Sequence, residues 1–392
     1  MAQPTCSMSR STASPNQISK QLLWINQPQQ LEKLIETLSK ETIVAVDTES
    51  DSLYSYFEKV CLIQFSTTVA DYLVDPLSVD VSGLAAIFAD QTIQKVFHAA
   101  EYDFLSLKRD YGFTFNNLFD TMIAARILGW SRYGLGNILG EHFEVKLDKR
   151  FQRYNWGKRP LSNQALNYAR LDTHYLLDLR TIQVAELTRQ NRMREAQEAF
   201  ERETQVEPSP KIFTPDDFWR IKGAKDLTPQ QQAILRELFI LRDKIARRIN
   251  RPPFKVMTDI TLIRIAKEQP RHVDQLEQIK GVGEKLVQYN SADILSAIKE
   301  GKNAPQPHYQ QSNNHAPDER TMTRYETLRQ WRNDLAAQRG VEPDVIMSNS
   351  SLMTIARRNP KSLAALTQMG VLGNWQFETY GQRLLRVLKN LT

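Results

Sequence analysis

Short apolar segments alternate with segments of helical periodicity through the first half of the chain. Apolar stretches rich in β-branched or aromatic residues predict strands at residues 42–46, 60–65, 72–74 and 93–97. Apolar residues at helical spacing predict helices over residues 81–89, 102–109, 122–128 and from 163 to about 192. Strands mixed with helices in this way predict an α/β domain with a mixed sheet flanked by helices.

Two polar segments, each with three prolines, divide the chain into three parts. The first covers residues 203–215 and the second covers residues 301–318. Polar segments with several prolines are typical of linkers. The predicted boundaries are a disordered tail at 1–17, an α/β domain at 18–205, a linker at 206–227, a first helical domain at 228–300, a linker at 301–318 and a second helical domain at 319–392.

The two segments that follow these linkers repeat each other at an offset of 90 residues. No gap is needed between Leu235 and Gly283 of the first copy. Both copies place apolar residues at helical spacing, so we interpret them as two copies of one small all-α domain. The matched pairs include Arg242 and Arg332, Pro253 and Pro343, Met257 and Met347, Leu262 and Leu352, Pro270 and Pro360, and Gly283 and Gly373.

Length and composition agree with several soluble domains. With 392 residues and a hydrophobic fraction of 41%, the chain can form two or three domains with cores. No apolar run is long enough to span a bilayer, and the first 20 residues lack the apolar segment of a secretory signal. Cys6 and Cys61 cannot form a disulfide framework, and Cys61 lies in an apolar run that predicts a core position. We therefore expect a cytoplasmic protein that is not attached to a membrane. A monomer is the default expectation, because the sequence shows no obvious self-association surface.

Charge is distributed unevenly along the chain. The 51 basic and 45 acidic residues give a net charge of +6. Residues 211–392 contain 29 basic and 19 acidic residues, a balance of +10, which leaves −4 for residues 1–210. The basic half is either an ordinary soluble helical surface or a phosphate-binding half that serves the acidic one.

Four carboxylates and a tyrosine carry the clearest chemical signal. Asp47 and Glu49 follow a predicted strand and are two residues apart, which puts both side chains on one strand face. Tyr168 and Asp172 are four residues apart in a predicted helix and share a helix face. Asp103 follows another predicted strand. Acids gathered at one point repel each other unless a cation lies among them, so the pattern predicts a site for hard divalent metals.

Each cluster taken alone also has a plain structural interpretation. The acids can be solvated, Asp103 can be a helix-terminal acid favoured by the helix dipole, and Tyr168 can be a core residue. Asp120 precedes a predicted helix, so we interpret it as an N-cap. His98 is assigned no catalytic role. None of these interpretations accounts for all three clusters in this order.

Two features of the first repeat are candidate nucleic-acid contacts. Four basic residues lie on one predicted helix and the loop after it: Lys244, Arg247, Arg248 and Arg251. A glycine-rich turn that contains Lys280, Gly281 and Gly283 can present backbone N–H groups to phosphate. A solvated helix face and a tight interhelical turn are the alternatives. The second repeat changes the turn to Met-Gly-Val-Leu-Gly at 369–373.

In this order the three acidic clusters resemble the three motifs of the 3′-to-5′ exonucleases that are named for their four acids. Tyr168 corresponds to the tyrosine subclass of that group. The stretch Trp-Gly-Lys-Arg-Pro-Leu-Ser at 156–162 resembles the ribonuclease D family, and the repeats resemble the HRDC-type helical domains of RecQ-type helicases and ribonuclease D. The resemblance covers residues 18 to 389. Ser50 departs from it, because many members carry an aromatic residue there.

The resemblance implies a ribonuclease H-like exonuclease domain and two bound Mg²⁺ or Mn²⁺ ions. It implies that Asp47 bridges the ions, that Glu49 and Asp172 complete the water-bearing site, that Asp103 holds the second ion through water, and that the Tyr168 hydroxyl orients the attacking water. The expected reaction trims the 3′ ends of structured RNA, with transfer RNA precursors as the family's usual substrate, and releases nucleoside 5′-monophosphates.

Three other functions remain open on the sequence alone. A DNA 3′-exonuclease can use the same acids, because the choice between RNA and DNA depends on contacts to the 2′-hydroxyl. A nucleic-acid-binding adaptor with structural acids would bind without cutting. A small-molecule phosphatase would leave the two basic helical domains unexplained.

Overall fold

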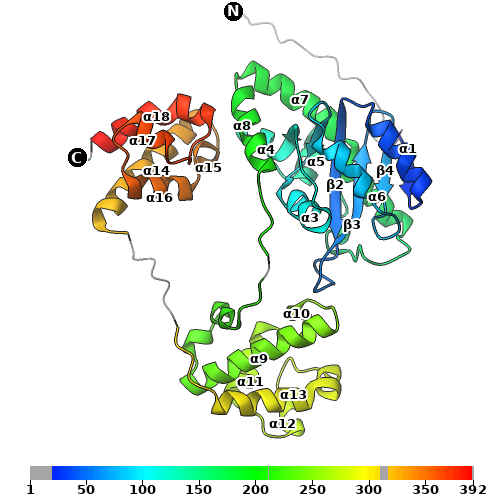
Figure 1. The fold of residues 1–392 in the computed structure, drawn as a ribbon, viewed down its shortest axis with the longest axis vertical. Helices are drawn as coiled ribbons and strands as arrows, with labels where there is room; N and C mark the ends of the chain where they lie inside the picture. The colour runs from blue at the N-terminus through cyan, green and yellow to red at the C-terminus, as the bar shows by residue number, and fades with distance from the viewer. Residues whose placement is uncertain (1–19, 211, 310–316, 391–392) are drawn as a thin grey trace, which may run out of the picture.

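The computed structural model describes residues 20–210, 212–309 and 317–390. The predicted disordered tail at 1–17 and Cys6 lie outside the described residues. Figure 1 shows an α/β part at the start of the chain, followed by two separate groups of helices. The predicted fold class, a mixed sheet flanked by helices and followed by two all-α domains, is confirmed.

A six-stranded mixed sheet forms the centre of the α/β domain. Its order is β1-β4-β3-β2-β5-β6. β3 pairs antiparallel with both β2 and β4, whereas β1 with β4, β2 with β5 and β5 with β6 are parallel. The strands are β1 (Gln21–Ile25), β2 (Ile43–Ser50), β3 (Val60–Ser66), β4 (Ala70–Val74), β5 (Gln94–Phe97) and β6 (Leu118–Asp120).

Two of the expectations for the strands need correction. β1 and β6 were not predicted: β6 has only three residues, whereas the apolar stretch at 22–25 in β1 was a strand signal that the prediction missed. The predicted strand 42–46 continues as β2 to Ser50, so Asp47 and Glu49 lie inside the strand and not after it. The extension follows from pairing: β3 supplies partners along β2 as far as Ser50. β3 and β4 are buried throughout, since helices cover both faces of the sheet.

Helices cover the sheet and close the domain. The predicted helix from 163 to about 192 is two helices, because the chain bends at Tyr175 between α6 and α7. α5 was not predicted. The helices are α1 (Pro28–Leu38), α2 (Ala85–Ala89), α3 (Glu101–Tyr111), α4 (Thr121–Leu128), α5 (Leu135–Phe143), α6 (Asn163–His174), α7 (Leu176–Arg189) and α8 (Met193–Thr204).

The two repeats fold into equivalent helical domains. In the first, Arg242 donates to the carbonyl of Met257 at 3.2 Å; in the second, Arg332 donates to the carbonyl of Met347 at 2.9 Å. The shared contact confirms the repeat found in the sequence. The first domain contains α9 (Pro229–Arg248), α10 (Pro253–Val256), α11 (Asp259–Glu268), α12 (Val273–Glu277) and α13 (Glu284–Asn303); the second contains α14 (Glu319–Arg339), α15 (Pro343–Ile346), α16 (Asn349–Arg358), α17 (Leu363–Thr367) and α18 (Asn374–Lys389).

The second helical domain docks on the α/β domain through its helix ends. Arg339, at the end of α14, forms an ion pair of 2.5 Å with the buried Glu195 of α8. The Glu198 carboxylate accepts hydrogen bonds from the backbone N–H groups of Trp375 and Gln376 in the first turn of α18. Charged side chains of α8 and α14 therefore hold the second helical domain against the α/β domain.

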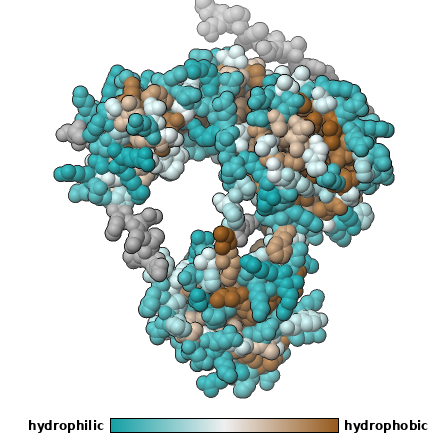
Figure 2. Space-filling view, viewed as in Figure 1, coloured by the Kyte–Doolittle hydropathy of each residue, from teal (hydrophilic) through white to brown (hydrophobic). Residues whose placement is uncertain are grey.

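The three domains surround an open space. Figure 2 shows this opening, with the α/β domain and the two helical domains on its borders. The α/β domain contacts both helical domains, and the sequence had left their arrangement open. No helix within the described ranges combines the length and apolarity needed to cross a bilayer.

Candidate active site

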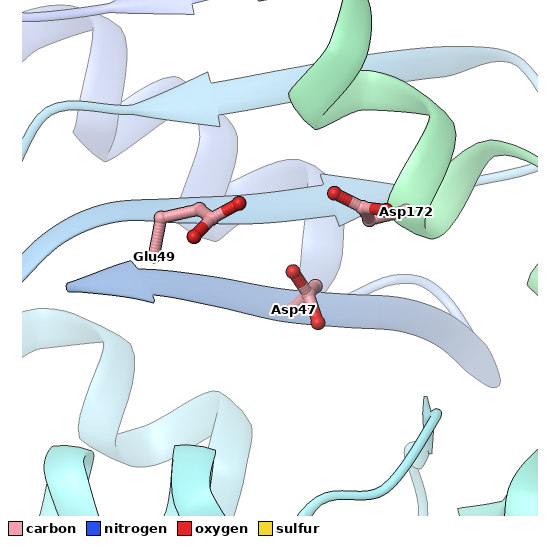
Figure 3. A group of neighbouring side chains, drawn as sticks. All are labelled: Asp47, Glu49 and Asp172. Atoms are coloured by element: carbon pink, nitrogen blue, oxygen red, sulfur yellow. The ribbon is translucent and has the colours of Figure 1, made fainter. Parts of the chain in front are cut away.

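Three carboxylates meet beside the centre of the sheet. Asp47 and Glu49 alternate with Thr48 along β2, so their side chains share one face. Asp172 reaches the same place from α6. One carboxylate oxygen from each of the three residues lies within 4.8 Å of the others. Figure 3 shows the three carboxyl groups gathered between β2 and α6.

Tyr168 lies one turn before Asp172 on α6 and is held by stacked aromatic rings. Its ring lies 5.2 Å from that of Phe151 and 6.3 Å from that of Trp156, at interplanar angles of 28° and 29°. α6 begins after Ser162, whose hydroxyl accepts from the Ala165 N–H and caps the helix. The ring stack fixes the side chain on the face of α6 that also carries Asp172.

Asp103 approaches β2 from the first turn of α3. Its carboxylate accepts a short hydrogen bond from the Thr48 hydroxyl, and its side chain is buried. It lies outside the group formed by Asp47, Glu49 and Asp172. β2 therefore uses its two faces differently: the acids face α6, and the hydroxyl between them fixes the fourth acid.

The acids repel each other in the absence of a cation. Burial, followed by the charges of Asp103, Asp172 and Glu49, raises the pKa of Asp47 well above its ordinary value. Burial and then Asp172 and Asp103 raise the pKa of Glu49. Burial followed by the charge of Asp103 raises the pKa of Asp172 to about 8. Burial raises the pKa of Asp103 to about 7, although the Thr48 hydrogen bond opposes the shift.

The donors present fit a hard divalent cation. Carboxylate oxygens are the ligands that Mg²⁺ and Mn²⁺ prefer, and a bound cation would remove the repulsion among them. Gln64 lies opposite Asp47 in the β2–β3 register and donates to it at 3.3 Å. The buried Gln64 Oε1 has no hydrogen-bond partner among the described residues, which leaves a further oxygen unsatisfied beside the acids.

A buried polar network fixes α6 against β4. Asp71 of β4 is fully buried and accepts from Arg170 Nε at 2.9 Å, lies 2.7 Å from His174 Nδ1, and accepts from Ser66 at 2.7 Å. Arg170 and His174 are two residues away from Asp172 on either side. The network therefore sets the position of the helix that carries Asp172 and Tyr168.

Asp120 and His98 lie next to the site but have other partners. The Asp120 carboxylate accepts from the backbone N–H groups of Met122 and Ile123, so its predicted role as an N-cap is confirmed. His98 Nδ1 lies 2.8 Å from the Thr121 hydroxyl. Cys61 is buried, as predicted, and burial raises the pKa of its thiol to about 12.

The four predicted basic contacts do not share one environment. Arg247 forms an ion pair with Asp243 and donates to the Tyr56 hydroxyl at 2.8 Å, so it joins α9 to the β2–β3 loop. Lys244, Arg248 and Arg251 are exposed on the same helix and the loop after it. Their contact with nucleic acid stays a prediction.

The glycine-rich turn lies between α12 and α13. Gly281 has φ = 105°, and an added Cβ would lie 2.4 Å from Thr261 Oγ1, so both the backbone and the packing need glycine there. Lys280 is exposed and its carbonyl accepts from Arg264 at 2.7 Å. The space around Gly283 is open. The turn is tight, as the structural interpretation expects, and a role in phosphate binding stays a prediction.

Sequence reasoning missed several residues that build the site. Thr48 lies between two assigned acids, and this position was its only signal. Gln64 and Asp71 gave none, because their roles arise from strand pairing and helix packing. Phe151 and Trp156 were near the recognised stretch at 156–162, but their stacking on Tyr168 depends on the fold.

Models of two protein families match three segments of the chain. A family model described as 3′-5′ exonuclease matches residues 22–187, and one described as HRDC domain matches residues 231–298 and again 322–388. These matches cover both the acid site and the two helical repeats.

Similar proteins match different shares of the chain. The chain is 33% identical to the exosome complex component 10 homolog of Caenorhabditis elegans over 72% of its own length and 33% of that protein. It is 26% identical to ribonuclease D of Bartonella henselae over 93% of its own length and 89% of that protein. The solved catalytic core of RRP6 from Trypanosoma brucei has a TM-score of 0.68 and 28% identity, and the match covers 74% of this chain and 81% of that one. The chain thus spans about a third of the exosome component and most of ribonuclease D.

Proposed function

We propose that the protein is a metal-dependent 3′-to-5′ exoribonuclease. Like ribonuclease D, which it matches over most of its length, it belongs to the 3′-5′ exonucleases, and two HRDC domains follow its exonuclease domain. The meeting of Asp47, Glu49 and Asp172, with Asp103 beside them, carries the proposal. These acids come from β2, α3 and α6, and their negative charges repel each other where they meet. An arrangement of this kind is expected where a cation is bound.

The acids are assigned to metal binding, as the sequence predicts. Asp47, Glu49 and Asp172 would hold a divalent cation directly, and Asp103 would contribute from α3. When bound, divalent cations polarise the phosphodiester and lower the pKa of bound water, and two Mg²⁺ or Mn²⁺ ions are proposed. The Thr48 hydroxyl keeps the Asp103 side chain oriented.

Tyr168 is proposed to position the attacking water with its hydroxyl group. Burial and the neighbouring Asp172 raise its pKa, so the phenol stays protonated and donates a hydrogen bond. Its stacking on Phe151 and Trp156 holds the hydroxyl in place. A role as general base is disfavoured by the same raised pKa.

The proposed substrate is the 3′ end of structured RNA, with transfer RNA precursors as the preferred class. Similarity to ribonuclease D and to the exosome component supports RNA over DNA. The product would be a nucleoside 5′-monophosphate. A DNA 3′-exonuclease and a non-cutting adaptor are the outcomes that the test must separate. Action as a cytoplasmic monomer stays a prediction from the sequence.

The first test uses 5′-labelled single-stranded RNA and matched DNA with Mg²⁺, with Mn²⁺ and with a chelator. We expect stepwise shortening of RNA from its 3′ end that requires metal and is lost in Asp172→Asn. Glu36→Gln is the control, because that exposed acid lies in a surface ion pair with Lys40 on α1. Shortening of DNA alone would indicate the DNA exonuclease, and binding without cutting would indicate the adaptor.

A further inference from the structure

The ring of Tyr102 stands at the edge of the acid site in a fixed position. Tyr102 precedes Asp103 on α3, and Ser50 follows Glu49 on β2. The hydroxyl groups of Ser50 and Tyr102 lie 3.0 Å apart and share a hydrogen bond. Tyr102 is nevertheless 47% exposed. One end of the side chain is therefore anchored and its aromatic face remains open.

The backbone of β2 is shaped to make this contact. The pairing register of β2 with β3 shifts between Glu49 and Ser50, as at a β-bulge. A bulge re-aims the side chain that follows it. Two hydroxyl contacts then join β2 to the start of α3: Thr48 to Asp103, and Ser50 to Tyr102.

Exposed large apolar side chains are few in the described part of the exonuclease domain. Among the described residues of the exonuclease domain, four large apolar side chains are exposed. Leu53 and Phe57 lie in the loop that leaves Ser50, Tyr102 lies on α3, and only Val69 is elsewhere. Three of the four therefore lie on Tyr102 itself or on the loop that follows its hydrogen-bond partner Ser50.

We propose that Tyr102, anchored by Ser50, is a stacking platform for a base of the RNA strand next to the cleaved phosphodiester. The proposal rests on the exonuclease function above and adds a residue to it. An exposed aromatic ring binds bases of any sequence, because every base has a π face. Such a platform suits an enzyme that shortens a strand through successive, different nucleotides. Tyr102 acts in substrate binding and leaves the acids unchanged.

The test compares Tyr102→Ala and Tyr102→Phe in the full-length protein. Loss of one stacked base is expected to raise KM for single-stranded RNA roughly tenfold, with kcat within about twofold. Tyr102→Phe keeps the ring and should stay within about threefold of the wild type. Ser50→Ala should match Tyr102→Phe, and the double variant should add nothing, because each removes the same hydrogen bond. Tyr289→Ala, at a 70% exposed position on α13, is the matched control.

A second arm asks whether the lost contact is to a base. RNA with an abasic ribose at the last, second-last or third-last position is compared with intact RNA. Where Tyr102 stacks on the missing base, the abasic RNA should bind the wild type about as weakly as intact RNA binds Tyr102→Ala. Tyr102→Ala should bind the intact and the abasic RNA equally well. A kcat that falls equally on intact and abasic RNA would instead assign Tyr102 to the support of the acids, and would overturn the proposal.

Binding in the presence of a chelator separates this proposal from the proposed function. Fluorescence anisotropy with labelled RNA needs no cleavage, and roughly tenfold weaker binding by Tyr102→Ala would support the platform even if the wild type does not cut. Equal binding and equal KM for Tyr102→Ala and the wild type would overturn it, whether or not the protein is an exonuclease.

Discussion

The Tyr56 hydroxyl donates a hydrogen bond of 2.6 Å to the Asp243 carboxylate, and thereby joins the exonuclease domain to the first HRDC domain. Tyr56 lies in the loop between β2 and β3, and Asp243 lies on α9. Arg247 completes the contact: it donates to Tyr56 at 2.8 Å and lies 2.8 Å from Asp243. The loop begins directly after the strand that carries Asp47 and Glu49, so the contact connects the helical domain to the acid site.

Tyr56→Phe is expected to loosen this contact. The substitution removes the hydroxyl that serves both Asp243 and Arg247, at a cost of roughly 1 kcal/mol. We expect a larger radius of gyration in small-angle X-ray scattering and a lower rate of RNA shortening. Tyr289→Phe, at an exposed position, is the control. Scattering identical to that of the wild type would show that the domains are held by other contacts.

Asp71→Asn is expected to destabilise the exonuclease domain strongly. Burial alone would raise the pKa of Asp71, but hydrogen bonds from His174, Ser66 and Arg170 outweigh it and lower the pKa. Removing the charge leaves the buried Arg170 without its carboxylate, at a cost of about 3 kcal/mol in the free energy of unfolding at pH 7. Urea unfolding measures this change. Glu36→Gln removes an exposed carboxylate on α1 and should have little effect.

The same substitution should also change how stability depends on pH. Because the folded-state pKa of Asp71 is depressed, its contribution is present above the unfolded-state pKa of about 3.9. It is lost as pH falls through the lower folded-state pKa. Asp71→Asn should therefore reduce the loss of stability in acid, measured as urea midpoints from pH 7 to pH 3. Parallel curves for the two proteins would contradict this assignment.

Gly373→Ala and Gly283→Ala form a matched pair at equivalent positions of the two repeats. A Cβ at Gly373 would lie 2.1 Å from the Glu198 carboxylate group, whereas nothing lies within 4 Å at Gly283. Glu198 would have to leave the first turn of α18, which costs about 1 kcal/mol, as for the loss of a cap. Thermal unfolding should show a larger decrease for Gly373→Ala than for Gly283→Ala. Equal decreases would show that Glu198 moves freely.

Asp172→Asn is expected to stabilise the metal-free protein while it abolishes activity. Burial and the charge of Asp103 raise the pKa of Asp172 to about 8, so its charged form destabilises the fold. The folded-state pKa of Asp172 lies above its unfolded-state value of about 3.9. Its contribution to the free energy of unfolding is therefore fully present below about pH 4 and is lost as pH rises toward 8. In a chelator at pH 8, Asp172→Asn should melt a few degrees higher than the wild type, about the change expected for 1 kcal/mol or more.

Addition of Mg²⁺ or Mn²⁺ should remove the advantage in melting temperature that Asp172→Asn has over the wild type. A cation stabilises the folded wild type by binding among its carboxylates, and Asp172→Asn has lost one of these ligands. The melting temperature of the wild type should therefore rise more than that of the variant. A wild-type melting temperature that does not respond to either metal would contradict a cation site.

The sequence by itself determined the features that depend on spacing within one element. Asp47 and Glu49 share a face because side chains alternate along a strand, and Tyr168 and Asp172 share a face because they are one helical turn apart. The repeat was equally visible, since residues in equivalent environments, such as Arg242 and Arg332, have the same local contacts.

Only the tertiary structure decided the contacts between elements. Asp103 meets Thr48 across 55 residues, and Arg247 meets Tyr56 across 191 residues, so that a predicted RNA contact lies between domains. Tyr102 showed no signal until α3 and β2 were brought together. Backbone periodicity fixes where a side chain points within its own element. The partner that it meets depends on how distant elements pack, and no local pattern records this.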